Sequence, residues 1–197
     1  MPPDIKFQDS IAIDTETKGL NIFLRDRLCV VQISDGGGDA HVVHMSQNDL
    51  DSGAKNLRKV LSDEKLTKIF HYARFDIAAI KIYLGIDVEN VYCTKIASKL
   101  VRTYTDKHSL KDLCNEILDI ELSKEQQCSD WGADKLTPQQ VDYAASDVLY
   151  LHEIKNRLDQ ILKSENRVKL AQKCFDFLPV RVELDINGWS EIDIFHH

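Results

Sequence analysis

The sequence predicts an α/β protein built on a mixed five-stranded sheet that is flanked by helices. Three short β-prone segments near the N-terminus support this prediction. A run of three glycines, Gly36 to Gly38, signals a hairpin between the second segment and the third. Helical and strand patterns then alternate along the chain, which is typical of helices that pack on a sheet. The expected strands are 11–16, 29–34, 40–45, 68–72 and 91–94.

The helices are predicted from their start and stop signals. The longest has the clearest start, because Thr137 can cap it, Pro138 suits the first helical position, and Gln140 stands three residues after the cap. Ser109 caps an earlier helix, and Gly85 ends another. The expected helices are 56–61, 73–84, 95–102, 109–118, 138–163 and a stretch near 166–175.

Composition limits the classes of protein that the chain can belong to. Its 197 residues suffice for one domain with a sizeable core, and its net charge is −7 with no dense run of Lys and Arg. This balance argues against a protein that grips long nucleic acid through many phosphates. The five cysteines are widely spaced and form no CxxC pair, and the chain has neither a long apolar span nor a signal-peptide pattern. We therefore expect reduced thiols, a cytoplasmic location and no membrane association.

Four acids and a tyrosine stand where the apolar pattern predicts core-facing side chains. Asp14 and Glu16 are two residues apart on an expected strand, so both carboxylates project from the same face. Tyr143 and Asp147 are four apart on an expected helix, so they stack on one side of it. Asp76 lies early in another helix. Separate explanations exist for single positions, because an early helical aspartate is stabilised by the helix dipole and a tyrosine can simply pack its ring.

Together these residues favour a metal site. Buried carboxylates are unfavourable unless cations hold them, and carboxylate oxygens suit hard divalent ions such as Mg²⁺ or Mn²⁺. The sequence therefore predicts a metal-dependent hydrolase.

Three short motifs resemble a known superfamily. DTETKGL, the FD of HYARFD, and YAASDV resemble the three exonuclease motifs of the DEDD superfamily of 3′→5′ exonucleases. Tyr143, four residues before the last aspartate, makes the chain resemble the tyrosine subgroup of this superfamily. The histidine subgroup would instead carry a histidine five residues before that aspartate, where this chain has Asp142. One departure is Tyr72, four residues before Asp76, where many relatives carry asparagine. It bears on local hydrogen bonding and substrate contacts rather than on the metal ligand.

A longer stretch resembles one family within that group. SLKDLCNEILDIELSK, CSDW and LTPQQVDYAASDVLYL look like ribonuclease D, and the resemblance covers roughly residues 8–163. The short chain and its ending, LDINGWSEIDIFHH, resemble the single-domain bacterial branch that includes nanoRNase C, which trims very short RNAs. The resemblance implies a ribonuclease H-like fold, with an exonuclease domain over 1–177. Residues 178–197 would then form an apolar C-terminal tail that docks on its own domain or on a neighbouring subunit of a homo-oligomer.

The resemblance also implies a mechanism and its residues. Two divalent cations would be held by Asp14, Glu16, Asp76 and Asp147, and Tyr143 would orient the attacking water. The products would be nucleoside 5′-monophosphates released from the 3′ end.

Further residues are predicted to contact the substrate. The superfamily places an apolar residue against the terminal base at the position of Leu20, although a turn leucine can also pack on the core. Trp131 is expected to pack rather than to stack on a base. The predicted substrate contacts are Thr15, Leu20, His71, Tyr72 and Lys124.

The expected activity is hydrolysis of short single-stranded RNA, down to dinucleotides, from the 3′ end. Two other activities fit the same catalytic residues: trimming of longer RNA 3′ ends, as in ribonuclease D, and 3′→5′ hydrolysis of DNA. A binding module without catalysis fits less well, because the chain keeps every acid of the motifs.

Overall fold

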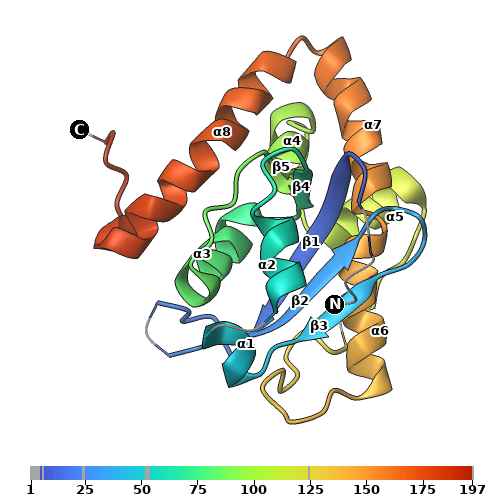
Figure 1. The fold of residues 1–197 in the computed structure, drawn as a ribbon. Helices are drawn as coiled ribbons and strands as arrows, with labels where there is room; N and C mark the ends of the chain where they lie inside the picture. The colour runs from blue at the N-terminus through green and yellow to red at the C-terminus, as the bar shows by residue number, and fades with distance from the viewer. Residues whose placement is uncertain (1–4, 6, 24, 52–53, 124, 197) are drawn as a thin grey trace.

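The computed structural model describes residues 5, 7–23, 25–51, 54–123 and 125–196. Its centre is a five-stranded sheet with the strand order β3-β2-β1-β4-β5 (Figure 1). β1 lies in the middle, antiparallel to β2 and parallel to β4, so the sheet is mixed as the sequence predicts. The strands are β1 (Ser10–Thr17), β2 (Leu28–Ser34), β3 (His41–His44), β4 (Thr67–Phe70) and β5 (Val91–Cys93).

Helices cover both faces of the sheet (Figure 1). α2 (Lys55–Leu61) and α3 (Ala73–Leu84) lie on one face, and α6 (Pro138–Leu149) packs on β1 and β2 from the other. Because β1 is central, helices reach it from both sides, and Ile11 and Ile13 are fully buried. The remaining helices are α1 (Gln47–Asp51), which the sequence analysis missed, α4 (Thr94–Val101), α5 (Leu110–Leu118), α7 (Leu151–Ser164) and α8 (Val168–Leu184).

The prediction of a single helix over 138–163 is wrong. The structure has α6 and α7 instead, separated at Tyr150, whose backbone (φ −99°, ψ −6°) lies outside the α-helical minimum. The two helices pack on different partners, α6 on β1 and β2 and α7 mainly on α4. The apolar row nevertheless continues across the break, because Val148, Leu151 and Ile154 are all fully buried.

The strand expected over 68–72 is also too long. β4 ends at Phe70, and Tyr72 adopts a left-handed backbone conformation (φ 68°) directly before α3. A left-handed residue cannot continue a strand, so the chain turns here. His71 and Tyr72 therefore lie in the turn that leads to Asp76.

The last helix runs further than the sequence indicates. α8 continues to Leu184, where a turn of π-helix, η1 (Asp185–Trp189), follows. The predicted boundary at residue 178 thus falls inside a helix, and Leu178 and Val182 are buried against the domain. No helix in the described part of the chain is both long enough and apolar enough to cross a membrane.

Candidate active site

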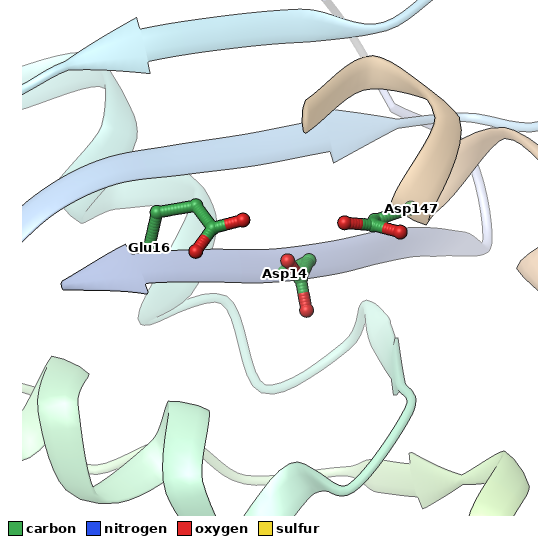
Figure 2. Close-up of side chains that lie close together, drawn as sticks. All are labelled: Asp14, Glu16 and Asp147. Carbon is green, nitrogen blue, oxygen red and sulfur yellow. The ribbon is translucent and has the colours of Figure 1, made fainter. Parts of the chain in front are cut away.

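Asp14 and Glu16 lie on β1 at the centre of the sheet. Asp14 faces Gln32 across the antiparallel pair with β2, and Glu16 faces Val30. The register shifts directly after Glu16, so the pairing is irregular at this edge of the site. Both acids are half-buried and project from the same face, as their spacing predicts (Figure 2).

α6 brings a third carboxylate to the same place. One carboxylate oxygen from each of Asp14, Glu16 and Asp147 lies within 4.8 Å of the other two (Figure 2). A capping box between Thr137 and Gln140 fixes the start of α6, as predicted, and so sets which residues face the sheet.

Asp76 stands slightly apart from these three acids. It lies in the first turn of α3, is only 3% exposed, and accepts a hydrogen bond of 2.7 Å from the Thr15 hydroxyl. Its charge still acts on the cluster, because it raises the pKa of Asp14. Thr15, predicted as a substrate contact, thus uses its hydroxyl to hold an acid of the site.

Burial and mutual repulsion raise the pKa values of all four acids. Burial, with the charges of the other three, holds the pKa of Asp14 well above its usual range. Burial and then Asp147 raise the pKa of Glu16 to about 9, and burial raises the pKa of Asp76 and of Asp147 to about 7. Without a cation, the cluster therefore does not ionise fully at neutral pH.

This donor set fits a hard divalent cation. Three carboxylates converge from two elements, and each offers an oxygen, which is the ligand type that Mg²⁺ and Mn²⁺ prefer. Cations would favour the ionised acids and so relieve their repulsion.

Tyr143 lies one helical turn before Asp147. Its ring packs on Trp131 with 6.0 Å between the ring centroids, and its hydroxyl lies close enough to the Asp147 carboxylate to act on the pKa of that acid, which it lowers. Burial raises the pKa of Tyr143, so the phenol stays protonated and can donate a hydrogen bond. Trp131 is 2% exposed and therefore packs behind the tyrosine, as expected, rather than offering a face to substrate.

A cavity of about 300 Å³ opens over the carboxylates. Its lining also includes Lys95 and Lys111, which the sequence analysis missed together with Ser109 and Gln127. Lys95 is the second residue of α4, just after the end of β5, and ligand-binding residues often gather at the ends of strands. Ser109 was predicted only as the cap of a helix. The predicted residues that line this cavity are Asp14, Thr15, Glu16, His71, Tyr72, Tyr143 and Asp147.

His71 and Tyr72 take different roles in the wall. The Nδ1 atom of His71 lies 2.9 Å from the Thr94 hydroxyl, and burial lowers the pKa of His71 to about 3. The imidazole is therefore neutral at physiological pH and tied to α4. The Tyr72 ring is half exposed, with the Lys95 ammonium 4.2 Å from its centroid.

The remaining predicted contacts lie elsewhere. Leu20 is 87% exposed and lines a second cavity, of about 570 Å³, which it shares with Tyr72, Arg74 and Phe75. Tyr72 thus borders both cavities. Lys124 lies outside the described residues.

Comparison with known proteins identifies the family. A model of the 3′-5′ exonuclease family matches residues 4–163. The chain belongs to this family. It is similar to ribonuclease D of Nitrobacter hamburgensis, with 30% identity over 185 residues that span 87% of this chain and 46% of the relative. It is also similar to DNA polymerase I of Aquifex aeolicus, with 32% identity over 76% of this chain and 24% of the relative. The chain thus spans less than half the length of these curated relatives.

Solved structures of NrnC match more completely. Brucella melitensis NrnC has a TM-score of 0.91 and 55% identity, covering 96% of this chain and 91% of that chain. NrnC with bound Mg²⁺ and NrnC bound to pGG match with TM-scores of 0.90 and 0.91 at 53% and 54% identity. Escherichia coli RNase D, at 22% identity and a TM-score of 0.73, shares the fold. The predicted fold, the exonuclease class and the resemblance to the ribonuclease D and nanoRNase C branch are confirmed.

Proposed function

We propose that the protein is a metal-dependent 3′→5′ exoribonuclease that hydrolyses short RNA, down to dinucleotides, to nucleoside 5′-monophosphates. The observation that carries this proposal is the convergence of Asp14, Glu16 and Asp147 within 4.8 Å in a cavity that two lysines also line. The similarity to NrnC bound to pGG supports a short substrate, because that match covers nearly all of both chains.

The four acids would hold two divalent cations, Mg²⁺ or Mn²⁺. Asp14, Glu16 and Asp147 supply the converging oxygens, and Asp76 adds its charge from behind Thr15. Bound there, the cations would stabilise the negative charge that develops on the phosphate during displacement. The similarity to NrnC with bound Mg²⁺ supports the choice of ion.

The side chains around the acids would orient the reactants. The Tyr143 hydroxyl, beside Asp147, would hydrogen-bond the attacking water and hold it in line with the phosphorus. Lys95 and Lys111 line the same cavity as the acids and would bind substrate phosphates. Tyr72 and Leu20 would contact bases, because aromatic and apolar side chains pack on any base.

Charge supports a short substrate. The protein carries a net charge of −7, and the lysines among the described residues that line the cavity are Lys95 and Lys111. Each phosphate contact adds binding energy and salt dependence, so a site with few lysines gains little from extra nucleotides. Affinity should therefore stop rising after a few nucleotides.

A homo-oligomer is part of the proposal. α8 and the segment after it expose a set of large apolar side chains, and exposed apolar patches of this kind mark association surfaces. Such a surface suits a second copy of the chain, while residues 178–184 pack on their own domain. The exposed apolar residues are Val168, Leu170, Phe177, Val180, Trp189, Ile192, Ile194 and Phe195.

The alternatives are trimming of longer RNA 3′ ends and 3′→5′ hydrolysis of DNA. The similarity to ribonuclease D supports the first and the similarity to DNA polymerase I supports the second. Both use the same carboxylates, so substrate preference separates them.

The test is kcat/KM for 5′-labelled di-, tetra- and decaribonucleotides and their DNA counterparts, with Mg²⁺, Mn²⁺ or EDTA. We expect the dinucleotide RNA to react fastest, EDTA to abolish turnover, and Asp14→Asn to lose nearly all activity. A clear preference for the decamer would refute the short-RNA assignment. A preference for DNA at every length would refute the ribonuclease assignment while leaving the exonuclease class intact.

A further inference from the structure

Gln32 is a buried polar residue in the middle of β2. Every residue of this strand is buried, and Gln32 is 0% exposed in the run LCVVQIS. An amide carries two donors and an acceptor, and burying these groups is unfavourable unless they are hydrogen-bonded. The contacts of its side chain therefore indicate why the strand keeps it.

The amide is only half satisfied, and its satisfied end contacts the acid cluster. Its Nε2 atom donates a hydrogen bond of 3.3 Å to Oδ2 of Asp14, which faces it across the strand pair. Its Oε1 atom is buried without a hydrogen-bond partner among the described residues. Against an ionised Asp14, the form that a bound cation favours, the reverse orientation would place two acceptors against each other, so the ionised carboxylate determines which way the amide points.

An unsatisfied buried oxygen destabilises the fold. An apolar side chain of the same size would avoid this loss in a strand whose residues are all buried, where Gln32 lies opposite Val42 of β3. Stability alone therefore gives no reason for glutamine here, and the contact with Asp14 does.

The other two aspartates of the site have a similar partner. Thr15 donates to Asp76 at 2.7 Å, and the Tyr143 hydroxyl interacts with Asp147. The three partners, Thr15, Tyr143 and Gln32, are all neutral. A neutral donor fixes a carboxylate without cancelling its charge, whereas a lysine or arginine would neutralise the acid and compete with a metal ion.

We propose that Gln32 is a positioning residue, whose amide holds one oxygen of Asp14 and so directs the carboxylate toward the metal cluster. This inference rests on the proposed metal-dependent function. Gln32 acts through Asp14 and has no expected contact with the RNA, because it is fully buried and does not line the cavity.

The test replaces Gln32 with methionine, which has a similar length and no hydrogen-bonding amide. We expect the melting temperature in EDTA to stay the same or rise, and Mn²⁺ binding, measured by calorimetry, to weaken about 10-fold or more, as is typical when a partner of a metal ligand is removed. At subsaturating Mn²⁺, kcat should fall while the KM for dinucleotide stays within about 2-fold, because bound substrate does not touch this residue.

Ser34→Ala is the matched control. Ser34 is two residues further along the same face of β2, is also 0% exposed, and donates a hydrogen bond of 2.7 Å to the Asp39 carbonyl. We expect this variant to lower the melting temperature and to leave the Mn²⁺ affinity unchanged.

Unchanged Mn²⁺ affinity in Gln32→Met would overturn the inference. Failure of both Gln32→Met and Gln32→Leu to fold would do the same, because it would make Gln32 a packing residue. The wild-type protein separates this result from the proposed function: if it binds Mn²⁺ and Asp14→Asn does not, the metal site stands whatever Gln32 does. A wild-type protein that binds no Mn²⁺ would refute both.

Discussion

Replacing Asp147 with asparagine should stabilise the metal-free protein at alkaline pH. The acid is mostly buried, and burial raises its pKa from 3.8 to about 7. Its charge also raises the pKa values of Asp14 and Glu16. Asparagine has nearly the same shape and can still accept a hydrogen bond from the Tyr143 hydroxyl, so the substitution removes the charge with little change in packing.

The sign and size follow from linkage. A carboxyl group with a raised pKa binds its proton more tightly in the folded state, so stability is greatest below about pH 4 and falls as the pH rises. For Asp147 the fall is complete above pH 7, and the pKa of Glu16 near 9 extends it further. A pKa difference of about 3 corresponds to ~4 kcal/mol, and relaxation of the neighbouring acids should leave ~2 kcal/mol. For a chain of this length that is a rise of roughly 4–8 °C in melting temperature.

Thermal unfolding in EDTA at pH 5 and pH 8.5 measures this effect. We expect the variant to melt above the wild type at pH 8.5 and the difference to shrink at pH 5, where the wild-type carboxyl is mostly protonated. Mn²⁺ should reverse the order at pH 8.5, because it stabilises only a protein that can bind it. A variant that melts below the wild type in EDTA at pH 8.5 would refute the reasoning, since it would show that the ionised acid contributes to the fold.

Three further outcomes are expected. Tyr143→Phe should lower kcat by about 100-fold or more, because it removes a hydrogen bond to the attacking water while the ring still packs on Trp131. Its Mn²⁺ affinity should hold, and a parallel collapse of affinity would instead make Tyr143 a support for Asp147. Mn²⁺ affinity of the wild type should rise between pH 6 and pH 9 with release of protons, and a flat profile would contradict the raised pKa values. Asp185→Ala should lower the free energy of unfolding by about 2 kcal/mol or more, because Arg74 and Arg181 both pair with this buried acid. Glu183→Ala is the control and should have little effect, because the Glu183 carboxylate pairs with Lys81 at an exposed position.

Much of the fold could be predicted because its signals are local. The capping boxes at Ser109 and Thr137 formed as the sequence indicates, and each expected strand overlaps an observed one. The spacing of Asp14 and Glu16, and of Tyr143 and Asp147, depends only on the geometry of one strand and one helix. These are properties of a few neighbouring residues, so the sequence contains them in full.

The errors fall where packing over long distances decides the outcome. Apolar periodicity runs unbroken through Tyr150, because both α6 and α7 bury the same row, and it therefore cannot show that the helix ends there. The extension of α8 to Leu184 is stabilised by the buried pairing of Asp185 with Arg74, a residue 111 positions away. No window of sequence contains such a contact.

The sequence by itself determined the acids, their local geometry and the family to which their motifs belong. Only the tertiary structure decided that Lys95 and Lys111 share a cavity with those acids, that Thr15 holds Asp76, and that Gln32 reaches Asp14. The physical reason is the range of the interactions. Helix and strand periodicities arise within one element, whereas the register between β1 and β2, and the placing of α4 and α5 beside the cavity, depend on how separate elements pack together.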